Sequence, residues 1–199
     1  MSVEKHIRDI IGVKKSKMKP SAGKLLVSEP FMPDMYFKRT VILLIEHNEE
    51  GSIGVVLNKP TFLKIKDVVN SFPDVNHTVH SGGPVNINNI YFLHRLSDII
   101  SEGDKLVDDV YWGGNKEEII DILQANYFDD DKMRIFMGYS GWTPGQLDFE
   151  IDNYSWIVTD LNTDLIFNTP AKELWSAVVE DMGHEYSYWK NLPINPQMN

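Results

Sequence analysis

The sequence predicts a single α+β domain. The chain has 199 residues, of which 42% are hydrophobic and 24% charged, and these values are typical of one globular domain rather than a disordered chain or a coiled coil. Segments with the composition of β-strands outnumber segments with helical spacing, and the two kinds do not alternate regularly. This order argues against a doubly wound parallel sheet and favours an α+β arrangement.

Strand signals dominate the first half of the chain. A run of five apolar residues, all β-branched or leucine, covers 41–45, and the polar turn at 48–51 joins it to a second apolar segment, so we expect a β-hairpin here. A short helix is expected to end before Pro73. The expected elements are strands over 23–27, 40–46, 53–57, 78–80 and 90–94, and a helix over 65–72.

The second half mixes helices and strands. Asn115 is a good N-cap for a helix over 116–125. Thr143, with Pro144 at the next position and Gln146 three residues on, predicts a capping box at the start of a short helix. Thr169 is expected to cap a helix over 170–182, closed by Gly183. The expected strands are 106–112 and 133–137, with a second hairpin of 154–158 and 165–167 around the turn 160–164.

Charge is distributed unevenly along the chain. The net charge is -10, yet residues 1–24 hold seven bases and two acids, which leaves about −15 for the remainder. We therefore divide the chain into a basic arm (1–21) with a short amphipathic helix over 2–11, a main domain (22–183) and an irregular tail (184–199). An acidic body repels nucleic acid and anionic membrane, so direct DNA binding is disfavoured.

Other compositional features narrow the class of protein. The chain has no cysteine, which excludes disulfides, thiolate metal sites and a cysteine nucleophile. No apolar run approaches the ~20 residues needed to cross a bilayer, and no secretory signal is recognisable, so we expect a cytoplasmic protein without membrane contact. Tyr186, Tyr188 and Trp189 form an aromatic group in the tail that suits either a homo-oligomer contact or docking on the same domain.

Several blocks of the sequence resemble the AlgH/YqgE family of bacterial proteins. They are Gly23–Pro30, Phe37–Val41, His47, Gly51–Pro60, Ser81–Val85, Leu93–His94 and Gly138–Leu147. The resemblance covers about residues 22–183. It implies a compact α+β fold in which helices wrap a small, barrel-like and mostly antiparallel sheet, and it carries the label of transcriptional regulator. The family has no agreed catalytic residues, so the resemblance assigns none to this chain.

The segment from Gly138 to Gln146 is the main candidate for a ligand site. A strand is expected to lead into a glycine-flanked loop and then into a helix N-terminus, where free N–H groups favour an anion. Ser140 and Thr143 could add hydroxyl groups, and Trp142 a stacking face. The alternative is that Gly138 and Gly141 only permit a tight turn while Trp142 anchors the core.

A second glycine pair, Gly82 and Gly83, could form another wall of the same pocket, or simply connect two strands. We assign no catalytic residue, because the nucleophile motif Gly-x-Ser-x-Gly fails at Trp142. We also expect no metal and no cofactor. Histidines 77 and 80 would face opposite sides of a strand, and Asp129–Asp131 lack the remaining ligands of a calcium loop.

Three functional hypotheses follow. The first is a non-enzymatic regulatory or interaction protein that acts through a protein partner or a small anion. The second is a small-molecule-binding enzyme with its site at the Gly82 and Gly138 loops. The third, a direct DNA-binding regulator, is weakened by the acidic body and by the acidic residues of the expected helix over 116–125.

Overall fold

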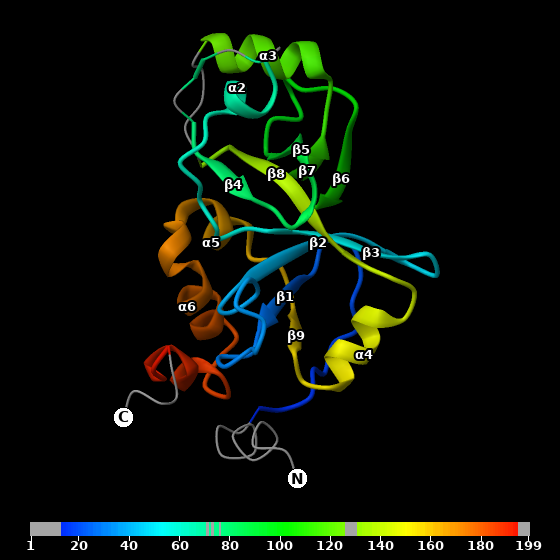
Figure 1. Ribbon diagram of the computed structural model, residues 1–199, viewed down its shortest axis with the longest axis vertical. Coiled ribbons are helices and arrows are strands. Elements are labelled where there is room, and N and C mark those ends of the chain that lie inside the picture. Colours follow the sequence, from blue (N-terminus) through cyan, green and yellow to red (C-terminus); the bar gives the residue numbers. More distant parts are fainter. Residues whose placement is uncertain (1–12, 71, 73, 76, 126–130, 195–199) are drawn as a thin grey trace.

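The computed structural model describes residues 13–70, 72, 74–75, 77–125 and 131–194. The expected helix over 2–11 and Asp129 and Asp130 lie outside this part. Figure 1 shows the arrangement of the elements. In chain order they are β1 Leu25–Ser28, β2 Val41–Asn48, β3 Gly51–Val56, α2 Ile65–Val68, β4 Val79–Ser81, β5 Val85–His94, β6 Gly103–Val107, β7 Val110–Gly113, α3 Lys116–Ala125, β8 Met133–Trp142, α4 Gln146–Asp152, β9 Trp156–Thr159, α5 Thr163–Asn168, α6 Ala171–Asp181 and the 3₁₀-helix η1 Ser187–Asn191.

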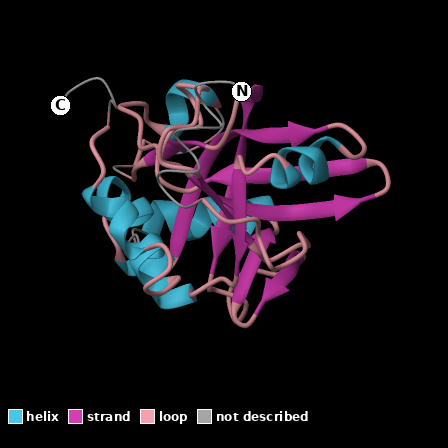
Figure 2. Cartoon of the chain, turned by 90° about the horizontal axis from the view of Figure 1, so that it is seen from below, coloured by secondary structure: helices cyan, strands magenta, loops and turns pink. Residues whose placement is uncertain are grey.

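The strands form one curled sheet, and the α+β prediction is confirmed. Its order is β6-β7-β5-β8-β3-β2-β1-β9, with β4 attached to β8, and within the described chain the pairing of β4 with β8 is the one parallel pair. The curl brings the start of β1 close to β6, where a Cβ on Gly23 would lie 3.1 Å from the carbonyl oxygen of Leu106. Figure 2 shows the strands from below, with helices at the side and the end of the sheet.

Strand β1, the first half of β2 and the end of β3 are buried on both faces, which explains the apolar runs Leu25–Val27, Val41–Leu44 and Val55–Leu57. On one face, Leu25 and Leu43 join a core cluster that includes residues of α5, α6 and η1. On the other face, Leu26 and Ile42 join a cluster under α4. A third cluster packs α2 and α3 against β4, β5 and β8, at the upper end of the molecule in Figure 1.

The predicted glycine loop over 138–142 is wrong, because these residues continue strand β8. Gly138 has a left-handed backbone (φ 69), a conformation that glycine adopts at little cost. Before it, β8 pairs with β4 and β5. After it, Tyr139 still pairs with Val85 of β5, and Ser140, Gly141 and Trp142 pair with β3. Gly138 thus lets one strand change partners and join the two halves of the sheet. Gln146, not Pro144, begins helix α4, and its side chain accepts from the Thr143 N–H (3.0 Å).

Two other strand predictions are wrong. The segment 165–167 belongs to helix α5, which starts at Thr163 after the Asn162 side chain accepts from the Leu165 N–H, and β9 pairs with β1 instead of forming a hairpin. The expected single strand over 106–112 is the β6–β7 hairpin, which turns at Asp108 (φ 47). The hairpin of β2 and β3 and the helix α3 are confirmed, the latter with Asn115 as its cap.

Both ends of the described chain pack on the body. Within the predicted tail, η1 carries Trp189, which is fully buried and stacks on Trp175 of α6 at 6.5 Å between ring centroids. Arg39 donates to the carbonyl oxygens of Leu192 and Pro193 beyond η1. Near the other end, Lys15 pairs with Asp152 (2.8 Å). Over the described residues, every helix is too short or too polar to pass through a lipid bilayer.

Candidate functional site

The structure brings the two predicted glycine segments together by direct backbone contact. A Cβ on Gly83 would lie 2.0 Å from the carbonyl carbon of Tyr139, and one on Gly82 would lie 2.3 Å from the carbonyl oxygen of Gly138. The Gly82 carbonyl accepts from the Val56 N–H (2.9 Å) and from the buried Ser140 hydroxyl (3.2 Å). Their own backbones therefore fill the space between the segments, and the Ser140 hydroxyl points at the backbone.

The other predicted site residues, Gly141, Trp142 and Thr143, line an open depression of about 430 Å³. The Trp142 ring is buried, and its indole N–H donates to the Glu150 carboxylate (2.9 Å), so it anchors the core rather than offering a stacking face. The Thr143 N–H is taken by the Gln146 side chain. Glu46 and Glu50 line the same depression and repel an anion there.

This depression adjoins a second one of about 590 Å³, and the two share Glu46, Ile53 and Tyr139. We call the pair the aromatic groove. Tyr91 stacks on Trp112 (5.5 Å between ring centroids) and meets Tyr139 edge-on (6.0 Å), and all three rings are half-buried. The sequence does not point to these rings, because they come from three strands, β5, β7 and β8, whose order in the sheet a sequence does not reveal. The rim polar residues are Asn86, Asp104 and Lys105.

A separate cavity of about 490 Å³ lies between β8 and the start of α6. We call it the Arg134 pocket; its polar lining includes Arg134, Lys172, Thr169, Asn168, His80 and Glu173. The Arg134 side chain is buried and donates to the carbonyl oxygens of Leu57 (3.1 Å), Thr169 (3.3 Å) and Phe167 (3.5 Å). The one signal in the sequence is a charged residue inside the apolar strand 133–137.

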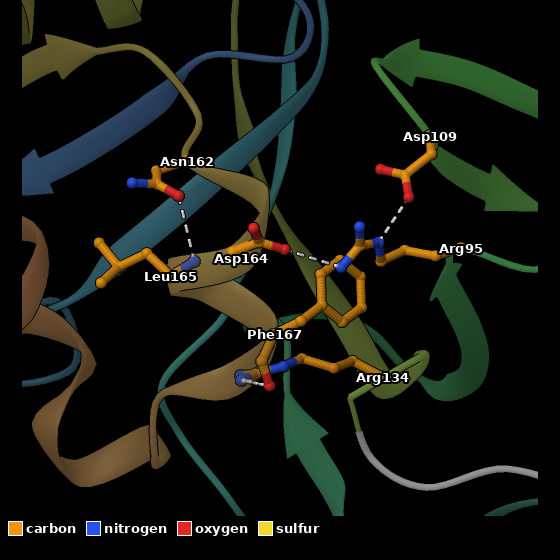
Figure 3. Close-up of polar contacts among 7 residues, drawn as sticks. All are labelled: Arg95, Asp109, Arg134, Asn162, Asp164, Leu165 and Phe167. Atoms are coloured by element: carbon orange, nitrogen blue, oxygen red, sulfur yellow. Dashed lines mark hydrogen bonds and ion pairs between the residues drawn. The ribbon is translucent and has the colours of Figure 1, made fainter.

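Helix α5 is held next to this pocket by two arginines (Figure 3). Arg134 reaches the Phe167 carbonyl, while Arg95, above the Phe167 ring, donates to Asp109 (2.7 Å) and Asp164 (3.1 Å). Hydrogen bonds to these two carboxylates raise the pKa of Arg95. The contacts tie α5 to β8 and to the β6–β7 turn, so one wall of the pocket is fixed by the sheet.

A third polar cluster lies beside Gly82. The Ser81 hydroxyl is 2.8 Å from the Tyr36 hydroxyl, and the Lys59 ammonium lies over the Tyr36 ring at 4.4 Å from its centroid. Burial lowers the pKa of Lys59, with Asp34 partly opposing this, and burial raises the pKa of Tyr36. Tyr36 is the shared neighbour of the Ser81 and Lys59 side chains. A lysine with a lowered pKa can serve as a base for a nucleophilic hydroxyl.

Histidines do not converge on an ion in the described part of the chain, where no three His, Asp or Glu side chains gather as metal ligands would. His47 bonds to Ser52 (2.8 Å) in the β2–β3 hairpin. His94 is fully buried, and its Nδ1 accepts from the Leu96 N–H (3.2 Å). Burial lowers the pKa of His94, which favours its neutral form, while the Gly113 backbone raises it in part.

The fold and its cavities define a single-domain α+β protein whose curled sheet bears an aromatic groove and a pocket with a buried arginine. A family model described as AlgH-like matches residues 25–187. A UPF0301 protein of Chlorobium chlorochromatii is 39% identical over 181 residues, which cover 91% of this chain and 96% of the relative. A UPF0301 protein of Cytophaga hutchinsonii is 38% identical over 178 residues, covering 89% and 98%. The chain belongs to the AlgH-like, UPF0301 family, as the sequence motifs predicted.

Solved structures agree on the fold. Protein DIP2367 of Corynebacterium diphtheriae aligns with a TM-score of 0.71 over 92% of this chain and 97% of its own, at 24% identity. The AlgH protein of Pseudomonas aeruginosa aligns with a TM-score of 0.68 over 89% and 98%, also at 24% identity. These likenesses confirm the compact α+β architecture with a curled, mostly antiparallel sheet.

Proposed function

We propose that the protein is a non-enzymatic interaction protein whose aromatic groove binds an extended, basic segment of a partner protein. The observation that carries this proposal is the composition of the groove, in which three half-buried aromatic rings lie among the carboxylates of Glu46, Glu50 and Asp104. Aromatic faces attract the cationic heads of lysine and arginine. Carboxylates around them add charge complementarity, which steers a basic partner to this surface.

The same charges separate a protein partner from the other ligands considered. Glu46 and Glu50 disfavour a small anion at Gly141 and Thr143. The charge of Lys105 is balanced by that of Asp104, so the two glutamates leave the groove as a whole acidic. Duplex DNA needs positive surface. A regulatory role, which the resemblance to the AlgH/YqgE family implies, would then pass through a protein partner rather than through direct contact with DNA.

Labelled peptides test this proposal. A twelve-residue peptide alternating arginine with serine is expected to bind the full chain saturably by fluorescence anisotropy, and the same peptide with glutamate for arginine is not. Glu46→Gln should weaken binding at least tenfold, as should Tyr139→Leu. Glu117→Gln changes another exposed carboxylate, on α3 outside the groove, and is the matched control. An equal loss of peptide affinity in Glu46→Gln and Glu117→Gln would show that binding depends only on the overall charge of the protein, and would contradict the proposal.

A second candidate is an enzyme with its site at the Gly82 segment, and the Tyr36–Ser81–Lys59 cluster is the observation that favours it. In this reading Ser81 is the nucleophile and Lys59 accepts its proton. A fluorophosphonate probe should then label the parent but not Ser81→Ala, with labelling reduced in Lys59→Gln. Labelling that persists in Ser81→Ala, or none in the parent, removes this candidate.

A further inference from the structure

We infer that the Arg134 pocket binds a small molecule through its phosphate or carboxylate group. This inference is independent of the proposed function, because the Arg134 pocket and the aromatic groove share no lining residue. The sequence predicted an anion site at the glycine segments, whereas the pocket lies at the other end of strand β8.

The first support is the buried guanidinium of Arg134. Arginine stays charged at every physiological pH and recognises carboxylate and phosphate through its planar fork. Its bonds to the carbonyls of Leu57, Phe167 and Thr169 fix its position from two sides of the cavity. A cation already held in place loses little conformational freedom when an anion arrives, which favours binding.

The second support is the convergence of other groups on the same cavity. Lys172 adds a second, exposed cation, and His80, Thr169 and Asn168 add polar groups. Helix α6 starts at this wall after Pro170, which supplies no side-chain cap. The Glu173 N–H donates to the Pro170 carbonyl (2.9 Å), whereas the N–H groups of Ala171 and Lys172 have no acceptor within the helix. Glu173 is the one carboxylate among the lining residues, against the two cations.

The third support is the shape and character of the remaining wall. Phe167, Met133 and Pro60 supply apolar surface beside the polar groups. The volume of about 490 Å³ falls in the range of small-molecule sites, about 300–1,000 Å³, which are commonly apolar with a few convergent polar groups. The pocket thus suits a ligand with an anionic head and an apolar body more than a bare ion.

A titration followed by amide NMR tests this inference on the full chain. Inorganic phosphate, phenyl phosphate and benzoate are added separately, so that the two anion chemistries are compared and the phosphate is tested with and without an apolar body. We expect saturable shifts of the amide signals of Thr169, Ala171, Lys172 and Glu173 with at least one of them, while the signals of Gly141 and Thr143 stay in place. Shifts of the Gly141 and Thr143 signals instead would overturn the inference and support an anion site at Gly138–Gln146, as the sequence predicted.

Two lysines form a matched pair for the same titration. Lys172 and Lys116 both lie exposed in the first turn of a helix, α6 and α3 respectively, but Lys116 is outside the pocket. Lys172→Gln should weaken binding at least tenfold, and Lys116→Gln should not change it. Arg134→Lys, checked for folding by its amide spectrum, should also lose binding. No saturation with any of the three anions, or equal weakening in the two glutamine variants, would overturn the inference.

Discussion

The contact between Gly83 and strand β8 allows a sharp prediction about Gly83→Ala. The added Cβ would lie 2.0 Å from the carbonyl carbon of Tyr139 and 2.1 Å from its oxygen. Carbon atoms in contact prefer about 3.5 Å, so the backbones must separate by more than an ångström. Overpacking of a core costs about 1–3 kcal/mol, and we expect about 3 kcal/mol here, because the contact is backbone to backbone. For a chain of this size that corresponds to a fall in Tm of about 6–12 °C.

Gly141→Ala is the matched control, since the sequence assigned Gly141 to the same candidate site. Its added Cβ meets the Tyr139 ring at 3.5 Å and Val85 at 4.0 Å, both ordinary contacts. We expect a change within about 0.5 kcal/mol, with stabilisation favoured by the lower entropy of the unfolded chain. Urea unfolding followed by tryptophan fluorescence measures both variants. A Gly83→Ala midpoint equal to that of Gly141→Ala would refute the role of close backbone packing.

Three further predictions concern pH, the half-buried carboxylate of Glu150, and DNA. Burial lowers the pKa of His94, so the histidine is protonated more readily in the unfolded chain, and the free energy of unfolding should decline as pH falls below about 6.5. In His94→Asn this part of the decline should vanish. Parallel curves of unfolding free energy against pH for the parent and the variant would contradict the prediction. Glu150→Ala removes the acceptor of two buried indole N–H groups, from Trp142 and Trp156, and should cost at least about 2 kcal/mol in urea unfolding; unchanged stability would show that other groups satisfy them. Fluorescent duplex DNA should bind only weakly, and binding should vanish at near-physiological salt or without residues 1–21; tight, sequence-dependent binding would restore the DNA-binding hypothesis.

Local signals predicted the elements that depend on local chemistry. The hairpin of β2 and β3 follows from a polar turn between two apolar segments, and helix α3 follows from the side chain of Asn115. The segment 165–167 shows the limit of this reasoning. Three apolar residues fit a strand as well as a helix, and what decides is the cap at Asn162 together with the packing of Ile166 and Phe167 into the core.

The candidate site was only partly predictable for a different reason. The sequence predicts a ligand site at Gly82, Gly83 and Gly138, but a glycine that leaves room for a ligand and one that leaves room for another backbone look the same in a sequence. The distances at Gly83 distinguish the two cases. The Arg134 pocket could not be predicted from the sequence. A single arginine in an apolar strand does not indicate that the carbonyls of Leu57, Phe167 and Thr169 will hold it.

Strand β8 connects the two surfaces on which function is proposed. Its first half carries Arg134 beside α6, its second half carries Tyr139 and Gly141 in the aromatic groove, and Gly138 makes the bend between them. Gly83 contacts the strand immediately after this bend. A side chain at Gly83 would therefore displace Tyr139 directly, whereas it would reach Arg134 only through several residues of paired strand. Gly82, Gly83 and Gly138 thus shape the strand that carries the groove residues, without lining the groove themselves.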